Sequence, residues 1–411
     1  MKKSSLIGIL LFLYVSACAP LTGSTPQTAE NNNPTGTAPT SEATLLPTET
    51  LAGIETAAPA TPEATATHMR PDERLAYVGE DGNLWLLDLL TEEQEQLTSD
   101  GRSMFSFSQE NSVTYQQPAW SSDGRFLAYE RTTYTPLADR TDIQESLWIY
   151  NGESGEMQPI LEDLQITGFS WRPQTHMIAY GEMIDLNYFT GRGTVDASLA
   201  KGILGVDVDS GEILELVKPQ GFSLVNPSWS GDGRFLGFNE VYLMEGGGFF
   251  AYYDFENEET IRWERPIGNY SWSADGSLIL YDNLTYVPNG EERILINNRM
   301  GTEEKVLSPL VENRYSSYPI YSPDGSMVAY KTASLLEEGP PDSLMVIPAS
   351  GGEARQLAEL VQISSILWSA DGNSLVVASG PFDTPKLVRV SAESGEVILL
   401  AEGWQPTWQP Q

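Results

Sequence analysis

Few side chains of this 411-residue chain could act as a nucleophile or a general base. The sequence contains one cysteine, Cys18, and two histidines, His68 and His176. A Ser–His–Asp triad needs a histidine beside the serine, and no Gly-x-Ser-x-Gly nucleophile motif occurs. His68 lies in a low-complexity segment, and His176 lies in a predicted turn where we expect a solvent-exposed side chain. The sequence therefore predicts no catalytic residues and favours a protein that is not an enzyme.

Carboxylates are abundant, with 57 Asp and Glu against 23 Lys and Arg, a formal net charge of −34. Some of them could form an acid pair, so a carboxylate-based enzyme acting on sugars or peptides stays an alternative. Loop carboxylates could also bind Ca²⁺, but no Asp-x-Asp-x-Asp-Gly sequence occurs, and we predict neither a metal site nor a cofactor. The charge argues against nucleic-acid partners, because phosphate binding requires a basic surface.

The single cysteine excludes an intramolecular disulfide but has a role of its own. Lys2 and Lys3 precede an apolar run over residues 6–15, which is too short to span a membrane and suits a signal peptide. The sequence Val-Ser-Ala-Cys at 15–18 resembles the lipobox of bacterial lipoproteins. That resemblance implies cleavage after residue 17 and diacylglyceryl attachment to Cys18, which would anchor the chain in a cell membrane or outer membrane, facing the extracytoplasmic side. The alternative is an ordinary secretory signal with an incidental cysteine.

Residues 18–70 have the composition of a linker. Between positions 19 and 68 there are 13 Thr, 10 Ala and 7 Pro, and no aromatic residue. Such a segment cannot bury enough apolar surface to offset its ordering entropy, so we expect a disordered tether.

A repeat begins beyond the linker and continues through residues 71–411. Each copy has an aromatic residue, usually Trp, then in most copies an Asp-Gly turn, and closes on a second residue, mostly aromatic, nine positions after the first. The first residue of each copy is Trp120, Trp171, Trp229, Trp272, Tyr321 or Trp368. The pattern predicts two short strands joined by a tight turn, and two more strands follow each copy. Four antiparallel strands every 40 to 58 residues are typical of a β-propeller blade.

These copies resemble the WD40-like (PD40) repeats of the TolB propeller family, and the sequence Tyr-Ser-Pro-Asp-Gly at 321–325 is most similar to the family signature. The resemblance implies an all-β propeller of four-stranded antiparallel blades. Residues 405–410 predict a first strand with nothing after it, and residues 74–98 predict second to fourth strands. We therefore expect a composite closing blade and seven blades in all, with the six-bladed ring of TolB as the alternative.

Long connections are expected on one rim of the propeller, which we call the loop rim. They lie at 101–116, 131–145, 181–201, 240–248, 282–292, 331–342 and 379–385, while the opposite rim carries the short Asp-Gly and hairpin turns. Aromatic and arginine side chains in these loops are candidates for a ligand-binding face. They are Arg131, Tyr134, Tyr188, Phe189, Arg192, Tyr242, Tyr286 and Phe382. Each ring could instead only pack against a blade edge.

Together these features predict a monomeric, membrane-anchored lipoprotein whose propeller binds a protein or peptide in the cell envelope. A glycan-binding protein is an alternative, beside the carboxylate-based enzyme.

Overall fold

The computed structural model describes residues 74–103, 111–137, 141–184, 186–191, 194–241, 248–263, 265–283, 292–336, 339–381 and 383–410. Over these ranges the chain is built from β-strands, with two short 3₁₀ turns, η1 (Leu186–Tyr188) and η2 (Ala197–Leu199), and no helix long and apolar enough to cross a membrane. The predicted signal peptide, Cys18 and the linker lie outside the described residues.

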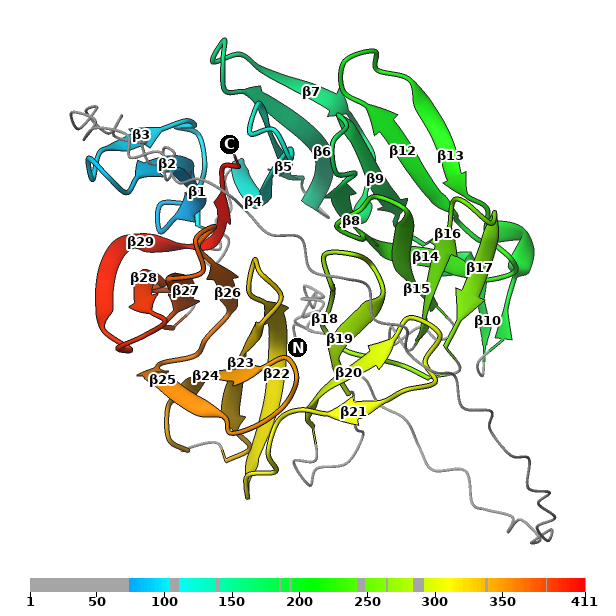
Figure 1. Cartoon of the computed structure of the whole chain (residues 1–411). Helices are drawn as coiled ribbons and strands as arrows, with labels where there is room; N and C mark the ends of the chain where they lie inside the picture. Colours follow the sequence, from blue (N-terminus) through cyan, green and yellow to red (C-terminus); the bar gives the residue numbers. More distant parts are fainter. Residues whose placement is uncertain are drawn as a thin grey trace, which may run out of the picture. The chain divides into compact units, whose positions relative to one another are not determined.

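Five separate four-stranded antiparallel sheets follow one another along the chain, each with its first strand innermost (Figure 1). The first contains β4 (Ser112–Trp120), β5 (Phe126–Pro136), β6 (Thr141–Asn151) and β7 (Met157–Leu161). The second contains β8 (Ile166–Trp171), β9 (Met177–Glu182), β12 (Ile203–Asp207) and β13 (Ile213–Val217). A small hairpin of β10 (Phe189–Gly191) and β11 (Thr194–Val195) lies between β9 and β12 in the chain.

The next three sheets repeat the same order. They are β14 (Ser223–Trp229), β15 (Phe235–Val241), β16 (Gly248–Asp254) and β17 (Glu259–Arg262); β18 (Tyr270–Trp272), β19 (Leu278–Asp282), β20 (Ile294–Asn298) and β21 (Lys305–Val306); and β22 (Arg314–Tyr321), β23 (Met327–Ser334), β24 (Asp342–Pro348) and β25 (Arg355–Leu360).

A seven-stranded sheet joins the two ends of the domain. Its strands are β26 (Ser365–Trp368), β27 (Ser374–Ser379), β28 (Lys386–Ser391), β29 (Val397–Trp408), β1 (Arg74–Gly79), β2 (Leu84–Asp88) and β3 (Gln94–Gln96). The first half of β29 pairs with β28, and the second half pairs with β1, so β29 serves two four-stranded units. This pairing confirms the predicted composite unit, here called the closing unit (β29, β1, β2 and β3).

Hydrophobic packing joins each unit to the next. Within the described ranges the core forms seven clusters, and each cluster combines buried residues of two consecutive units, for example Trp368 with Val346, or Leu75 with Val376. Three of the repeat tryptophans also donate a hydrogen bond across the boundary between units, which we call a seam: Trp171 Nε1 to Ala119 O at 2.9 Å, Trp272 Nε1 to Ser228 O at 3.2 Å and Trp368 Nε1 to Ile320 O at 3.4 Å. Seven units joined by seven seams are what a seven-bladed ring requires.

The Asp-Gly turns have the same internal structure in five units. In each, a serine hydroxyl donates to the aspartate two residues later, and the aspartate also accepts a backbone N–H two residues further on. The glycine that follows has φ between 65° and 70°, as at Gly276 and Gly325. Hydrogen bonds led by that from Ser322 lower the pKa of Asp324 to about 2. These aspartates are therefore turn residues.

The innermost strands carry a recurrent β-bulge that the repeat pattern did not predict. Gln117, Asn226, Tyr318 and Gln405 each lie three positions before the repeat aromatic, immediately before a proline, and have φ between 49° and 57°. The strand register shifts at each of these points. The bulge bends the inner strand and re-aims its side chains.

Candidate functional site

Of the eight residues predicted to form a ligand-binding face, the structure describes four. Arg192, Tyr242, Tyr286 and Phe382 lie outside the described residues. Phe189 packs edge-on against Tyr188, with ring centroids 5.0 Å apart. Tyr134 lies opposite Ile143 in the β5–β6 ladder, where burial raises the pKa of its hydroxyl.

Tyr188 is a correction to the sequence prediction. Its side chain is fully buried, its hydroxyl donates to Val241 O at 3.1 Å, and Ser223 N donates to the same hydroxyl at 3.0 Å. The ring anchors the 181–201 connection to the next unit and cannot contact a ligand, because both hydrogen-bonding directions of its hydroxyl are used within the protein.

Arg131 lines a pocket of about 380 Å³ at the seam between the closing unit and the β4–β7 unit. We call it the Arg131 pocket. It is lined by Leu97, Thr98, Ser99, Asp100, Tyr115, Tyr129, Arg131, Trp148 and Met157. Asp100 lies in the connection that follows β3, and Arg131 lies within β5, away from the Asp-Gly turn that precedes this strand, so the pocket lies toward the loop rim. The predicted connection 131–145 is corrected here, because residues 131–136 continue β5 and residues 141–145 begin β6.

The polar groups of the Arg131 pocket form one network. Arg131 Nη2 lies 3.1 Å from Asp100 Oδ2, and Tyr115 donates its hydroxyl proton to Asp100 Oδ1 at 2.5 Å. The guanidinium also donates to Thr133 Oγ1 and lies 5.6 Å from the centroid of the Trp148 ring. The ring and the carboxylate together hold the guanidinium in one position.

Partial burial controls ionisation in this network. Burial opposes ionisation of Asp100, but the hydrogen bonds from Tyr115 and Arg131 outweigh it and hold the pKa of the carboxyl below its usual value. Burial, and then the adjacent Asp100, raise the pKa of Tyr115 to about 12. At neutral pH the pocket therefore presents an ionised carboxylate, a guanidinium and a neutral phenol.

This arrangement can bind a polar ligand. The side chain of Asp100 is 54% exposed and that of Arg131 is 25% exposed, so both charges can reach a ligand. Aromatic walls beside a charge pair suit a peptide or a sugar. Sequence reasoning identified Arg131 but missed Asp100, Tyr115 and Trp148, because nothing local marks them. Tyr115 lies opposite Arg131 in the β4–β5 ladder, Trp148 lies in β6 of the same sheet, and Asp100 approaches from the connection after β3.

His176 is a second correction, because its imidazole is not a solvent-exposed loop group. The side chain is 17% exposed, and its ring nitrogens lie 2.6 Å from Asp209 Oδ2 and 2.9 Å from Asp123 Oδ2. The ring packs edge-on against Phe126. Burial opposes its charge, but the bonds to Asp123 and Asp209 outweigh that effect and raise the pKa of His176. His176 therefore links two units, and its protonated form makes an ion pair with both carboxylates.

Two buried acids, Glu130 and Asp282, also have perturbed ionisation. Burial, and then repulsion by Glu145, raise the pKa of Glu130 to about 8, and burial raises that of Asp282 to about 7. Asp282 accepts hydrogen bonds from Asn269 and from the backbone of Tyr318. Among the described residues, no group of three or more His, Cys, Asp or Glu side chains is placed to hold a metal ion.

No protein-family model and no curated protein matches the chain. Solved structures do match. A structure of oligogalacturonate lyase in complex with manganese has 14% sequence identity and a TM-score of 0.57, over 80% of this chain and 83% of that chain. A structure from a study of two prolyl endopeptidases has 15% identity and a TM-score of 0.58, over 81% of this chain and 49% of that chain, so this chain spans about half of that protein.

The fold is a β-propeller. TolB from Acinetobacter baumannii also matches, with 19% identity and a TM-score of 0.44 over 84% of this chain and 69% of that chain. At such identities these matches concern the architecture of the propeller, and function must be argued from its own side chains. Within the propeller, the predicted repeats lie where the sequence placed them, with the Asp-Gly turn joining the first and second strands of each four-stranded blade that contains it.

Proposed function

We propose that this propeller is a binding scaffold that recognises a protein or peptide partner at the Arg131 pocket. The observation that carries the proposal is the partly exposed Arg131–Asp100 pair beside Tyr115 and Trp148. Opposite charges at fixed positions can pair with the backbone and charged side chains of a peptide, and the aromatic walls can receive an apolar side chain.

We further propose that the propeller faces the extracytoplasmic side of a cell membrane or outer membrane, anchored through lipidated Cys18. The support is the basic, apolar and small-residue pattern that ends at Cys18, followed by a Thr-, Ala- and Pro-rich linker. Replacing Cys18 by Ser tests the anchor. The wild type should sediment with membranes and C18S should appear in the soluble fraction, whereas equal sedimentation would contradict the anchor.

Binding is tested with the full chain on peptide and glycan arrays. Arg131→Gln removes the charge of the pocket, and Arg125→Gln is the matched control, because Arg125 lies at an Asp-Gly turn on the opposite rim and contacts Glu153. We expect peptide binding that R131Q weakens by about tenfold and R125Q leaves unchanged. Binding to glycans alone would favour the glycan-binding alternative, and turnover of either ligand would favour the enzyme.

A further inference from the structure

The rim with the short turns, which we call the turn rim, carries a recurrent position that is basic in three of the six repeat copies. It lies five residues after the first aromatic of each repeat and is occupied by Arg125, His176, Arg234, Ser277, Ser326 or Asn373. In the first three units the residue is basic and pairs with an acid in the third-to-fourth strand hairpin of its own unit. The distances are 3.6 Å for Arg125–Glu153, 2.6 Å for His176–Asp209 and 3.0 Å for Arg234–Asp254.

His176 shows what this position can do at a seam. Its imidazole lies between Asp209 of its own unit and Asp123 of the preceding unit, on the edge of Phe126. A half-buried positive charge between two carboxylates is well stabilised, because each carboxylate accepts one ring N–H.

The seam between the β22–β25 and β26–β29 units has equivalent residues, except that the position of His176 is occupied by a different residue type. By the repeat alignment, Asp324 is equivalent to Asp123, Met327 to Phe126, Glu393 to Asp209, and Asn373 to His176. Asn373 is neutral, and its amide donates to Asp371 of its own turn at 2.8 Å. It therefore brings no positive charge to Asp324.

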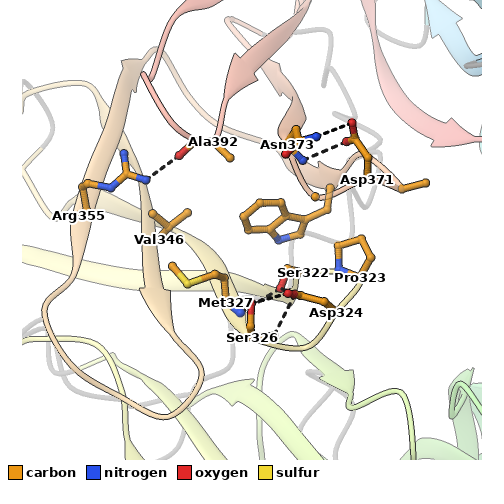
Figure 2. A pocket seen from close by; sticks show the side chains of 13 residues that line it. Ser322, Pro323, Asp324, Ser326, Met327, Val346, Arg355, Asp371, Asn373 and Ala392 are labelled. Carbon is orange, nitrogen blue, oxygen red and sulfur yellow. Dashed lines mark hydrogen bonds between the residues drawn. The ribbon is translucent and has the colours of Figure 1, made fainter. Parts of the chain in front are cut away.

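A pocket of about 430 Å³ lies at this seam (Figure 2). Asp324, Asp371, Trp368, Met327 and Val346 all line this pocket. Arg355 is the one basic residue among the 13 that line the pocket, and its guanidinium donates to Ala392 O and Glu393 O. The pocket thus combines an apolar wall with an excess of carboxylate charge.

We propose that this pocket binds a cationic group, a primary ammonium or a guanidinium on a short aliphatic stem, in the position that His176 takes at the other seam. The charge would lie beside Asp324, whose carboxylate is held in place by Ser322 and by both the backbone and the hydroxyl of Ser326. The stem would pack against Met327 and Val346. The cation can belong to a free amine or to a Lys or Arg side chain of a protein partner.

Calorimetric titration of the full chain at about 0.15 M salt tests this site, since that salt screens general attraction to an acidic surface. The probes are agmatine and a tri-arginine peptide, with glutamate as the anionic control. Asp324→Asn removes the charge and keeps an acceptor for Ser322. Asp275→Asn is the matched control, because the Asp275 turn makes the same serine contacts. We expect D324N to weaken cation binding by about tenfold and D275N to leave it unchanged.

Asn373→His gives a second, independent readout. The introduced imidazole should occupy the pocket as His176 does and weaken binding of the cationic probes. The melting temperature of N373H should be higher at pH 6 than at pH 9.

The two probes distinguish the sources of the cation. Binding of agmatine and tri-arginine alike indicates a free amine, and binding of tri-arginine alone indicates a partner side chain. Equal loss in D324N and D275N, or no saturable binding of either probe below about 10 mM, would overturn the proposal.

Discussion

Leu75 and Trp408 lie directly opposite each other in antiparallel strands, although they come from the two ends of the propeller. The pair is part of the β1–β29 ladder. Both side chains belong to the hydrophobic cluster that joins the β26–β29 unit to the closing unit. The closing strand pairing therefore removes two exposed sheet edges at once.

We expect Trp408→Ala to destabilise the propeller by about 2 kcal/mol, because it removes a large, partly buried ring from this cluster. Urea unfolding at equilibrium measures the change. Leu399→Ala on the same strand is the control, since Leu399 is 58% exposed and should change stability by less than about 0.5 kcal/mol. Equal effects of the two variants would show that closure does not depend on Trp408.

The bulge at Gln117 predicts an inversion of the usual strand preferences. Its φ of 51° is unfavourable for any residue with a Cβ, so Gln117→Gly should be neutral to about 1 kcal/mol stabilising and Gln117→Val should cost about 1–2 kcal/mol. The adjacent Gln116 pairs regularly with Glu130. There, Gly should destabilise and Val should be tolerated. Thermal unfolding of the four variants is the measurement, and the same order at both positions would contradict the bulge.

His176 predicts a stability that depends on pH. Its pKa is raised above 6.5, so the ion pair stabilises the folded state fully below about pH 6.5 and loses that contribution as the pH rises through the folded pKa. Asp123 stays ionised over this range, since burial of its carboxyl is outweighed by bonds from Ser121 and His176 that lower its pKa to about 2. His176→Gln should therefore lower the melting temperature more at pH 5.5 than at pH 9.

The control for this experiment is His68→Gln, which alters the other histidine of the chain. A melting-temperature difference for His176→Gln that is the same at both pH values would show that the imidazole acts by packing on Phe126 alone.

Glu130 predicts a pH effect through its buried carboxyl, one of whose oxygens, Oε1, has no hydrogen-bond partner. Its pKa is raised from 4.5 to about 8, so between these pH values the folded protein holds a proton that the unfolded chain has lost. Stability of the wild type falls over this range, and Glu130→Gln removes the effect. We expect E130Q to match the wild type at about pH 4.5 and to be more stable at pH 8 in urea unfolding. Glu153→Gln, which is largely exposed, should show no such trend.

The sequence alone was sufficient to predict the propeller fold and its closing unit. Strands of alternating apolar residues and Asp-Gly turns are local signals, and they recur in one order along the chain. The unit that begins at residue 74 lacks its first strand, and the strand that ends at residue 408 is an additional first strand, so the sequence alone indicates that the two belong to one unit. The strand-pairing rule that a propeller leaves no open edge then joined them.

Only the tertiary structure decided which side chains meet at the seams. Asp100 reaches Arg131 from the connection after β3, and His176 and Asp123 lie in the turns of two consecutive units, so both contacts depend on how neighbouring units pack against each other. Tyr188 is an aromatic loop residue by sequence, yet it is buried because Ser223 and Val241 of the next blade bond its hydroxyl. Local patterns determine strands and turns, whereas contacts between blades are non-local, and the propeller's functional surfaces are made of those contacts.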